Sequence, residues 1–471
     1  MVGSEVAARD RRRSLSVLAL IVCGALVITA QTPPTHPARA GTGLIPTIDA
    51  LAASAFPNDR PGAIVLAAKD GRAVFKRAYG LADLEFSTML EPDMLMRIGS
   101  VTKQFTAGVI LRLMELGKLR MSDPVSTYLP DYPETGRTIT IEHLLTHTSG
   151  LPNYTALPEY GLGQTRRLSV DALLSLFNDR PLEFIPGTRF SYSNSGYAVL
   201  GAIIEKVTRQ TFAEALREYI LVPIGAREIR YDSAERILQR RARGYEWDGT
   251  AYRNASYLDM SQPYAAGALV STADDLLTWD TALSSGRILK PESLARMMTP
   301  FRLANGTTTT YGYGWELANY AGHAVAEHSG GINGFRCHVV RIADANVYVA
   351  VLSNDGSVAG KPVRLARKIA SLLVGAPLAE PPVTALPPSM LDQFAGRYRF
   401  PNERWIRIAR DGDHLRMEGP AGEGVLDAVR GDQFKERGGV AQFEFLRDDD
   451  GRINGVEQSG WGAPEQGKKE P

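Results

Sequence analysis

The sequence predicts an α/β protein in which an antiparallel sheet, flanked by helices and interrupted by an inserted helical subdomain, is followed by a small all-β barrel or sandwich domain. Three observations support this prediction. Strand-like segments lie near both ends of the region before residue 375, helical segments lie between them, and a Pro-rich stretch precedes a β-rich C-terminus. With 471 residues, 44% of them apolar and 22% charged, the chain is long enough for two or more globular domains.

Residues 1–40 are predicted to be a signal peptide. Three arginines at positions 11 to 13 precede an apolar stretch from Leu15 to Ala30, and a Pro-rich segment ending in Ala-Arg-Ala at Ala40 follows. We expect cleavage near Ala40 or Ala30 and a periplasmic or secreted protein with no stable membrane anchor. An uncleaved anchor is the alternative, although the apolar stretch is short for a bilayer span of about 20 residues.

The region 41–375, which we take as one domain, begins and ends with strand patterns. Residues 62–80 read as two strands joined at Asp70-Gly71, a dipeptide that suits the positive φ angles of a tight hairpin turn, and residues 337–354 repeat the pattern. Helical periodicity lies between them, in the segments 102–119, 169–179, 195–209, 212–221 and 271–283. The simplest assembly is one sheet built from both ends of the domain, with helices inserted between its strands.

The C-terminal part of the chain is predicted to be a separate domain. Residues 376–388 are too rich in proline for a helix or a central strand, and they read as a stiff linker. Residues 389–471 alternate apolar and polar positions around Asp-Gly turns, a pattern typical of a small all-β barrel or sandwich.

Composition restricts the classes of partner. Lys and Arg number 53 against 52 Asp and Glu, so the net charge is +1 and no basic surface indicates nucleic acid or an anionic membrane. Cys337 would be the single cysteine after cleavage, in an apolar run that favours a small buried hydrophobe. His143 and His147 share a helical spacing but lack a recognisable third ligand, so we expect no metal and no cofactor. The oligomeric state is not indicated.

The pair Ser100 and Lys103 is the first candidate for chemistry. On a helix, residues three apart share a face, so the Ser100 hydroxyl and the Lys103 amine could lie within hydrogen-bond reach. This arrangement suits a nucleophile and its base. The alternative is that Ser100 caps the helix and Lys103 is an ordinary solvated residue.

Two further segments contain candidate site residues. Tyr192 and Asn194 form a Tyr-x-Asn immediately before a predicted helix, where a buried tyrosine and a turn-forming asparagine are the alternative interpretation. The run His328-Ser329-Gly330-Gly331 precedes a predicted strand. Glycines at a strand edge allow a ligand to approach closely, and their N–H groups can point at an oxyanion, although a surface turn with an incidental histidine would look the same.

Taken in order, Ser100-x-x-Lys103, Tyr192-x-Asn194 and His328-Ser329-Gly330 resemble the three-motif layout of the serine β-lactamase and penicillin-binding-protein superfamily. The resemblance covers about residues 45 to 375. It includes the phrases LLTHTSGLPNY, FSYSNSGYAVLG and AAGALVSTADDL, which are typical of the class C-like branch with its esterases and D-aminopeptidases. It implies a β-lactamase/transpeptidase-like fold, and residues 389–471 look like the lipocalin-like β domain of many relatives in that branch.

The resemblance implies a role for each catalytic residue. Ser100 would be the nucleophile, Lys103 its base, and Tyr192 the relay that protonates the leaving group and later activates the deacylating water. Asn194 would bind Lys103 or the substrate. The N–H groups of Ser100 and Gly331 would form the oxyanion hole.

His328, Ser329, Gly330 and Gly331 would contribute to substrate binding. Where β-lactam-specialised relatives carry Lys-Thr-Gly, this chain has His328-Ser329-Gly330. We expect His328 to titrate near pH 6.5, the ordinary range of an imidazole. The loss of a permanent cation places efficient β-lactam binding in doubt.

The function that we expect is that of an exported serine hydrolase acting through an acyl-enzyme on esters or amides, with D-amino-acid peptides as one substrate class. One alternative is a β-lactamase or a D,D-carboxypeptidase acting on peptidoglycan stems. Another is a penicillin-recognising sensor that acylates without turnover. The expected partner is a small ester, amide or short peptide.

Overall fold

The computed structural model describes residues 43–358, 360–378, 382–400, 404–419, 422–437, 440–448, 450–460 and 464–470. The predicted signal peptide lies outside the described residues. Within these ranges no helix combines the length and the apolar character that a membrane span requires.

The α-helices are α1 (Leu44–Ala55), α2 (Thr102–Glu115), α3 (Ile141–Leu145), α4 (Pro158–Gly163), α5 (Val170–Leu174), α6 (Asn194–Thr208), α7 (Phe212–Leu216), α8 (Val222–Ile224), α9 (Tyr264–Gly267), α10 (Ala273–Ser284), α11 (Pro291–Met297), α12 (Lys361–Leu373) and α13 (Pro388–Leu391). Shorter helical turns are η1 (Gly99–Val101), η2 (Val125–Thr127), η3 (Glu134–Arg137), η4 (Tyr154–Ala156), η5 (Arg217–Leu221) and η6 (Asp392–Phe394).

The strands before the linker are β1 (Ala63–Lys69), β2 (Arg72–Tyr79), β3 (Leu81–Asp83), β4 (Thr88–Met89), β5 (Met96–Arg97), β6 (Arg230–Tyr231), β7 (Tyr245–Trp247), β8 (Tyr252–Asn254), β9 (Leu269–Ser271), β10 (Glu316–Tyr320), β11 (His323–Ile332), β12 (Phe335–Ile342) and β13 (Val347–Ser353). Those after it are β14 (Gly396–Arg399), β15 (Trp405–Asp411), β16 (His414–Gly419), β17 (Gly422–Arg430), β18 (Gln433–Glu436), β19 (Gln442–Arg447), β20 (Ile453–Ser459) and β21 (Glu465–Lys469).

The principal sheet joins the two ends of the first domain, as the sequence predicts. Its six strands run in the order β10-β11-β12-β13-β1-β2, and β1 pairs antiparallel with β13, for example Val65 with Val351. The predicted hairpin between β1 and β2 turns at Asp70 and Gly71, whose φ angles are 52° and 72°. A left-handed conformation at both residues is what a tight two-residue hairpin turn requires.

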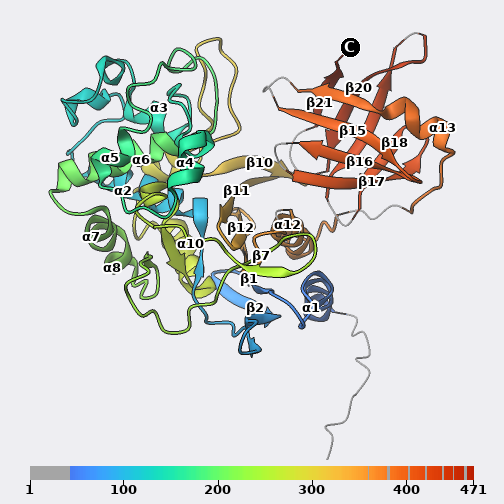
Figure 1. The fold of residues 1–471 in the computed structure, drawn as a ribbon, viewed down its shortest axis with the longest axis horizontal. Helices are drawn as coiled ribbons and strands as arrows, with labels where there is room; N and C mark the ends of the chain where they lie inside the picture. The colour runs from blue at the N-terminus through green and yellow to red at the C-terminus, as the bar shows by residue number, and fades with distance from the viewer. Residues whose placement is uncertain are drawn as a thin grey trace, which may run out of the picture. The chain divides into compact units, whose positions relative to one another are not determined.

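Both faces of this sheet are covered (Figure 1). Val65 packs on one face with α1 and α12, through side chains such as Ile48 and Ile369. Its neighbour Leu66 points to the opposite face and belongs to the larger core, which includes residues of α2, α6 and α10. Because alternate residues of each central strand enter different cores, the strands read as continuous apolar runs.

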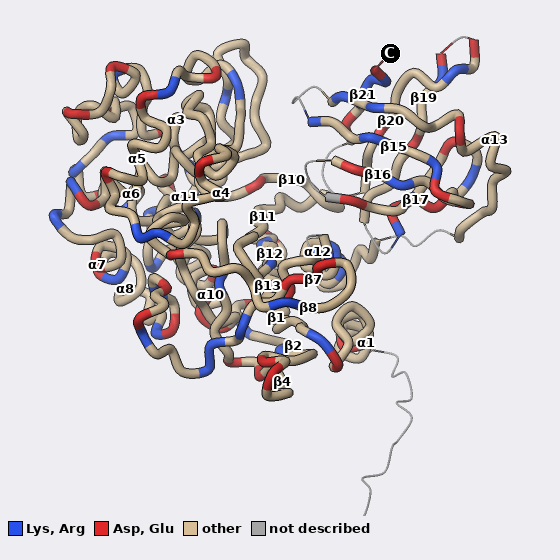
Figure 2. The backbone as a smooth tube through the Cα atoms, in the orientation of Figure 1, with Lys and Arg blue, Asp and Glu red and all other residues tan. Residues whose placement is uncertain are grey.

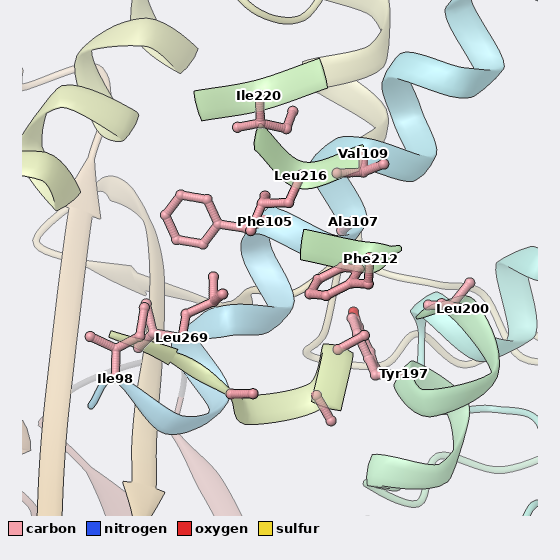
Figure 3. Close-up of a cluster of buried hydrophobic side chains, with 14 of the residues drawn as sticks. Ile98, Phe105, Ala107, Val109, Tyr197, Leu200, Phe212, Leu216, Ile220 and Leu269 are labelled. Atoms are coloured by element: carbon pink, nitrogen blue, oxygen red, sulfur yellow. The ribbon is translucent and has the colours of Figure 1, made fainter. Parts of the chain in front are cut away.

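The inserted helical subdomain is organised around α2. Figure 3 shows Phe105 and Val109 of α2 packed among Phe212, Leu216 and Ile220 of the α7–η5 segment. Helix α2 is buried on nearly every side, so even Lys103 in its first turn is inaccessible to solvent. A cation in such a position must lose its charge or find hydrogen-bond partners.

The C-terminal domain is a closed barrel of eight antiparallel strands, so the barrel alternative of the prediction is correct. The pairing of β14 with β21, through Tyr398 and Lys469, closes it. Its own core includes Phe394, Phe434 and Phe445. Figure 2 shows acidic and basic residues interspersed along its strands, and Arg416 pairs with Glu423 in this way. The described surface of the barrel is therefore electrically mixed, in keeping with the balanced composition of the chain.

Candidate active site

Ser100 lies in η1, immediately before α2. The residue that caps η1 is Ile98 and the one that caps α2 is Val101, and neither cap is made by a side-chain hydrogen bond. The capping interpretation of Ser100 is therefore wrong. The hydroxyl is partly exposed and lines a cavity instead.

Lys103 is held by three polar atoms. Its Nζ lies 3.0 Å from Ser100 Oγ, 2.8 Å from Asn194 Oδ1 and 2.9 Å from the Ala266 carbonyl oxygen. Burial lowers the pKa of Lys103 well below its usual range. A neutral amine has two N–H donors and one lone pair. The two donors match the Asn194 and Ala266 oxygens, which leaves the lone pair to accept the hydroxyl proton of Ser100.

The orientation of Asn194 supports this arrangement. Its Nδ2 donates to Thr155 Oγ1 at 2.9 Å, and its backbone N–H donates to Asn153 Oδ1 at 3.0 Å. Because the amide nitrogen is engaged with Thr155, the carbonyl oxygen faces Lys103. Asn194 therefore binds the Lys103 amine. It is the first residue of α6.

Tyr192 adjoins the same amine. The Lys103 Nζ lies 4.9 Å from the centroid of the Tyr192 ring. Burial raises the pKa of Tyr192, and the Ser100 hydroxyl acts in the opposite direction. The net shift is upward, so Tyr192 is a phenol and not a phenolate at neutral pH.

Two glycine contacts bring β11 against η1. Gly99 has φ +48°, and a Cβ on it would lie only 2.8 Å from the Gly331 nitrogen. A Cβ on Gly330 would lie 2.0 Å from the Ile98 carbonyl oxygen. Since real Cβ atoms do not approach so closely, only glycine permits this backbone contact. It places Ser100 and Gly331 on the wall of one cavity.

The cavity in front of Ser100 has a volume of about 200 Å³. It is lined by Ser100, Tyr154, Thr155, Tyr160, Asn194, Leu258, Pro263, Ala266, Gly267, Gly331, Ile332 and Asn333. None of these residues carries an acidic or basic side chain. The lining offers hydroxyl and amide groups beside apolar surface.

His328 does not lie where the sequence analysis places it. Its ring is 1% exposed and does not line the cavity. Nδ1 lies 2.6 Å from the Ser329 carbonyl oxygen and must donate to it, so Nε2 accepts the hydroxyl proton of Tyr311 at 2.7 Å. Burial lowers the pKa of His328 to about 3. The expected titration near pH 6.5 is therefore wrong, because the ring is enclosed and both nitrogens are occupied.

Ser329 and Gly330 do not line the cavity either. The Ser329 hydroxyl lies 3.0 Å from His338 Nδ1. His338 Nε2 in turn donates to Glu327, which is paired with Arg367. Of the four residues His328 to Gly331, only Gly331 lines the cavity. The other three belong to β11 but do not line the cavity.

Four residues that the sequence analysis does not single out hold the site together. Asn153 and Ala266 lie within the quoted phrases of the resemblance, and Thr155 follows one of them directly, so a signal exists for these three. Tyr311, the partner of His328, has no such signal in the sequence.

Cys337 is buried as predicted. Among the residues that the structure describes, no group of three His, Cys, Asp or Glu side chains is arranged to hold a metal.

The chain is similar to known proteins over most of its length. The family described as Beta-lactamase matches residues 48–373, and a domain of unknown function, DUF3471, matches residues 380–467. Penicillin-binding protein 4* of Bacillus subtilis is 29% identical over 75% of this chain and 83% of its own length. A D-aminopeptidase of Gluconobacter oxydans is 29% identical over 64% of this chain and 57% of its own length. The octameric penicillin-binding protein homologue from Pyrococcus abyssi has a TM-score of 0.63 at 26% identity, covering 90% of this chain and 98% of its own.

The chain belongs to the Beta-lactamase family, because the family match extends over more than half of its length. It is a serine hydrolase with a β-lactamase-like fold, and the resemblance to penicillin-binding-protein and D-aminopeptidase relatives is confirmed.

Proposed function

We propose that this protein is an exported hydrolase that cleaves uncharged esters or amides through an acyl-enzyme formed on Ser100. The observation that carries the proposal is the 3.0 Å contact between the Ser100 hydroxyl and the buried Lys103 amine, whose pKa is lowered by burial. A serine hydroxyl is a weak nucleophile until a neighbouring base takes its proton. The Lys103 amine already lies within hydrogen-bond distance of this hydroxyl.

In acylation, the Ser100 proton passes to the Lys103 lone pair as Oγ attacks the substrate carbonyl. The N–H groups of Ser100 and Gly331 would stabilise the oxyanion, and removal of one such donor typically costs about 10²-fold in rate. When the intermediate collapses, the leaving group takes the phenolic proton of Tyr192. The Lys103 ammonium then returns a proton to Tyr192, so that both groups are again neutral.

In deacylation, Tyr192 serves as a relay and Lys103 as the final base. The raised pKa of Tyr192 means that no phenolate is available to accept a proton from water directly. The water proton therefore moves to the Tyr192 oxygen while the phenolic proton moves to Lys103. When the acyl bond breaks, the Lys103 ammonium returns this proton to Ser100 Oγ, so that the resting state is restored. This refines the role of general base that the family resemblance suggests for Tyr192.

The uncharged lining of the cavity favours a neutral acyl group. A free ammonium group would find no carboxylate there, and a carboxylate would find no lining cation. Burying an unpaired charge is expensive, so both should bind poorly. We therefore place amino-blocked or neutral substrates ahead of substrates with a free amino terminus and ahead of β-lactams, which carry a carboxylate.

Three single substitutions test the residue roles. Ser100→Ala should abolish turnover and covalent labelling by a fluorophosphonate probe. Lys103→Ala and Tyr192→Phe should each lower kcat by about 10²-fold or more, the usual contribution of an acid–base group. Near-normal rates with Ser100→Ala would contradict the proposal. Steady turnover by the unaltered enzyme after the first acylation would exclude the sensor alternative.

A substrate panel tests the charge preference. We expect kcat/KM to be highest for a neutral p-nitrophenyl ester, and higher for an N-acetylated D-alanine p-nitroanilide than for the free-amino form; nitrocefin should be the poorest substrate. Arg336 provides the control, because its Nη1 would lie 3.2 Å from a Cβ on Gly331 although the residue is not part of the cavity lining. Arg336→Gln should leave neutral substrates unaffected. A preference for the free amine or for nitrocefin would contradict the assignment.

Export is proposed from the N-terminal sequence alone. The arginines and the apolar stretch before Ala40 support it. N-terminal sequencing of protein recovered from the periplasm or the medium should show a start near residue 31 or 41. A start at residue 1 would favour the uncleaved anchor.

A further inference from the structure

His147 adjoins the catalytic tyrosine, and two further tyrosine rings surround it. It follows α3 and is 1% exposed. Its ring centroid lies 4.3 Å from that of Tyr192, 4.6 Å from that of Tyr311 and 5.2 Å from that of Tyr197. Among the described residues, Nδ1 of His147 accepts from the Ser193 backbone and Nε2 has no hydrogen-bond partner, and His147 does not line the cavity. It therefore touches the relay residue without facing the substrate.

Two hydrogen bonds from the backbone beside Tyr192 converge on this histidine. The Ser191 N–H donates to the His147 carbonyl oxygen at 2.9 Å, and the Ser193 N–H donates to His147 Nδ1 at 3.1 Å. These donors are the residues immediately before and after Tyr192. Together with the ring contact, they fix both the backbone of Tyr192 and the plane of its phenol.

The histidine adopts this position at an energetic cost. Its φ is 57°, in the left-handed region that non-glycine residues adopt infrequently. Because Nδ1 accepts a hydrogen bond, the ring proton is on Nε2, and Nε2 has no hydrogen-bond partner among the described residues. Backbone strain and an unsatisfied buried donor each cost on the order of 1–3 kcal/mol, and such features persist where the surrounding structure requires them.

We infer that His147 is a positioning residue for Tyr192, holding its hydroxyl in reach of Ser100 through the paired hydrogen bonds to Ser191 and Ser193. This inference rests on the relay role of Tyr192 in the proposed function. His147 remains neutral throughout, because burial lowers its pKa and the neighbouring Lys103 acts in the same direction. Its contribution is to geometry and not to proton transfer.

Two variants test the hydrogen bond from the Ser193 N–H to His147 Nδ1 separately from the remainder of the side chain. His147→Gly tolerates the positive φ and removes the acceptor, whereas His147→Asn also tolerates it and offers Oδ1 close to the place of Nδ1. A misplacement of about 1 Å can cost 10²-fold in rate, so we expect His147→Gly to lower kcat by about that factor with KM changed less than about threefold. His147→Asn should recover most of the lost rate.

A double-substitution cycle with Tyr192→Phe gives the decisive measurement. If His147 acts through the tyrosine hydroxyl, His147→Gly should lower the residual rate of Tyr192→Phe by no more than about twofold, since residues that act as a unit are non-additive. Circular dichroism and fluorophosphonate labelling of Ser100 establish that each variant is folded. If His147→Gly does not fold, His147→Asn takes its place in the cycle, and a loss of rate as large in the Tyr192→Phe background as in the unaltered enzyme contradicts the inference.

Two results would overturn the inference while leaving the relay role of Tyr192 intact. One is an equal loss from His147→Gly in the unaltered enzyme and in the Tyr192→Phe variant. The other is a His147→Asn variant as slow as His147→Gly. A Tyr192→Phe variant with the normal rate would instead overturn the relay role itself, and with it the basis of this inference. The two failures are therefore distinguishable.

Discussion

At the scale of single residues, the site is built from titratable groups whose charged forms are disfavoured by burial. Lys103, His147 and His328 all have lowered pKa values, and that of Tyr192 is raised. Each shift has desolvation as its largest cause. In the proposed mechanism, protons therefore pass between Ser100, Lys103 and Tyr192 from a neutral starting state, without a permanent ion pair that would have to be broken.

The neutral His328 predicts how stability depends on pH. In the unfolded chain its pKa returns to about 6.5, whereas in the folded protein it is about 3. Between these values the unfolded state binds a proton that the folded state excludes, so acidification favours unfolding by about 1.4 kcal/mol per pH unit for this residue. His328→Asn should make the decline in unfolding free energy from pH 6 to pH 5 shallower by about that amount. Equal slopes in urea titrations would contradict the assignment.

The same residue should leave no trace in the pH profile of activity. Because His328 remains neutral above about pH 3, the acid limb of kcat/KM must come from another group, and protonation of Lys103 is the cause that we expect. The rate therefore falls as the pH drops below the lowered pKa of Lys103. His328→Asn and the unaltered enzyme should share the same acid midpoint. Loss of an ionisation between pH 6 and 7 in the variant alone would show that His328 titrates.

At the scale of elements, the approach of β11 to η1 depends on one glycine more than on its neighbour. A Cβ on Gly330 would lie 2.0 Å from the Ile98 oxygen and 2.4 Å from Cys337 Sγ. A Cβ on Gly331 would meet only the Arg336 side chain, at 3.2 Å or more, and a flexible side chain can move away.

Adjacent alanine substitutions should therefore behave differently. Gly330→Ala must push β11 away from η1, so we expect a loss of about 1–3 kcal/mol or more in unfolding free energy and a large loss of activity. Gly331→Ala should fold normally and change stability by less than about 1 kcal/mol, as expected of an exposed position. Thermal melts of the two variants provide the measurement. Equal melting temperatures would show that the backbone contact is looser than described.

What the sequence can predict differs between these elements. The spacing of Ser100 and Lys103 on one helical face is legible because helix geometry alone brings i and i+3 together. The direction of the His328 side chain cannot be predicted in this way, because strand alternation assigns neighbours to opposite faces without indicating which face meets the substrate. Its partner Tyr311 lies 17 residues away along the chain and shares no local pattern with it. The network of Ser329, His338 and Glu327 likewise depends on strand pairing that periodicity cannot assign.

At the scale of the whole molecule, the described residues form three separate hydrophobic cores. One core lies on each face of the principal sheet, and the third is confined to the barrel. The linker between α12 and the barrel has hydrogen bonds to both domains, one at each end. Leu378 N–H donates to Ser371 Oγ in α12, whereas Thr384 N–H donates to the Ala428 carbonyl oxygen in β17. Each side of the linker is therefore anchored to its own domain.

This separation predicts that the hydrolase domain folds without the barrel. A chain ending at Leu378 retains both cores of the principal sheet, all of α12 and every residue assigned to the catalytic cavity. A domain with its own core can fold alone, so we expect one cooperative thermal transition within about 3 °C of the corresponding transition in the full chain, the shift that roughly 1 kcal/mol produces in a domain of this size. Fluorophosphonate should label Ser100 in the shortened chain, and the Ser100→Ala version is the control. An unfolded or aggregated product would show that the barrel contributes to the stability of the first domain, whereas a folded product that no longer reacts would show that it contributes to the site.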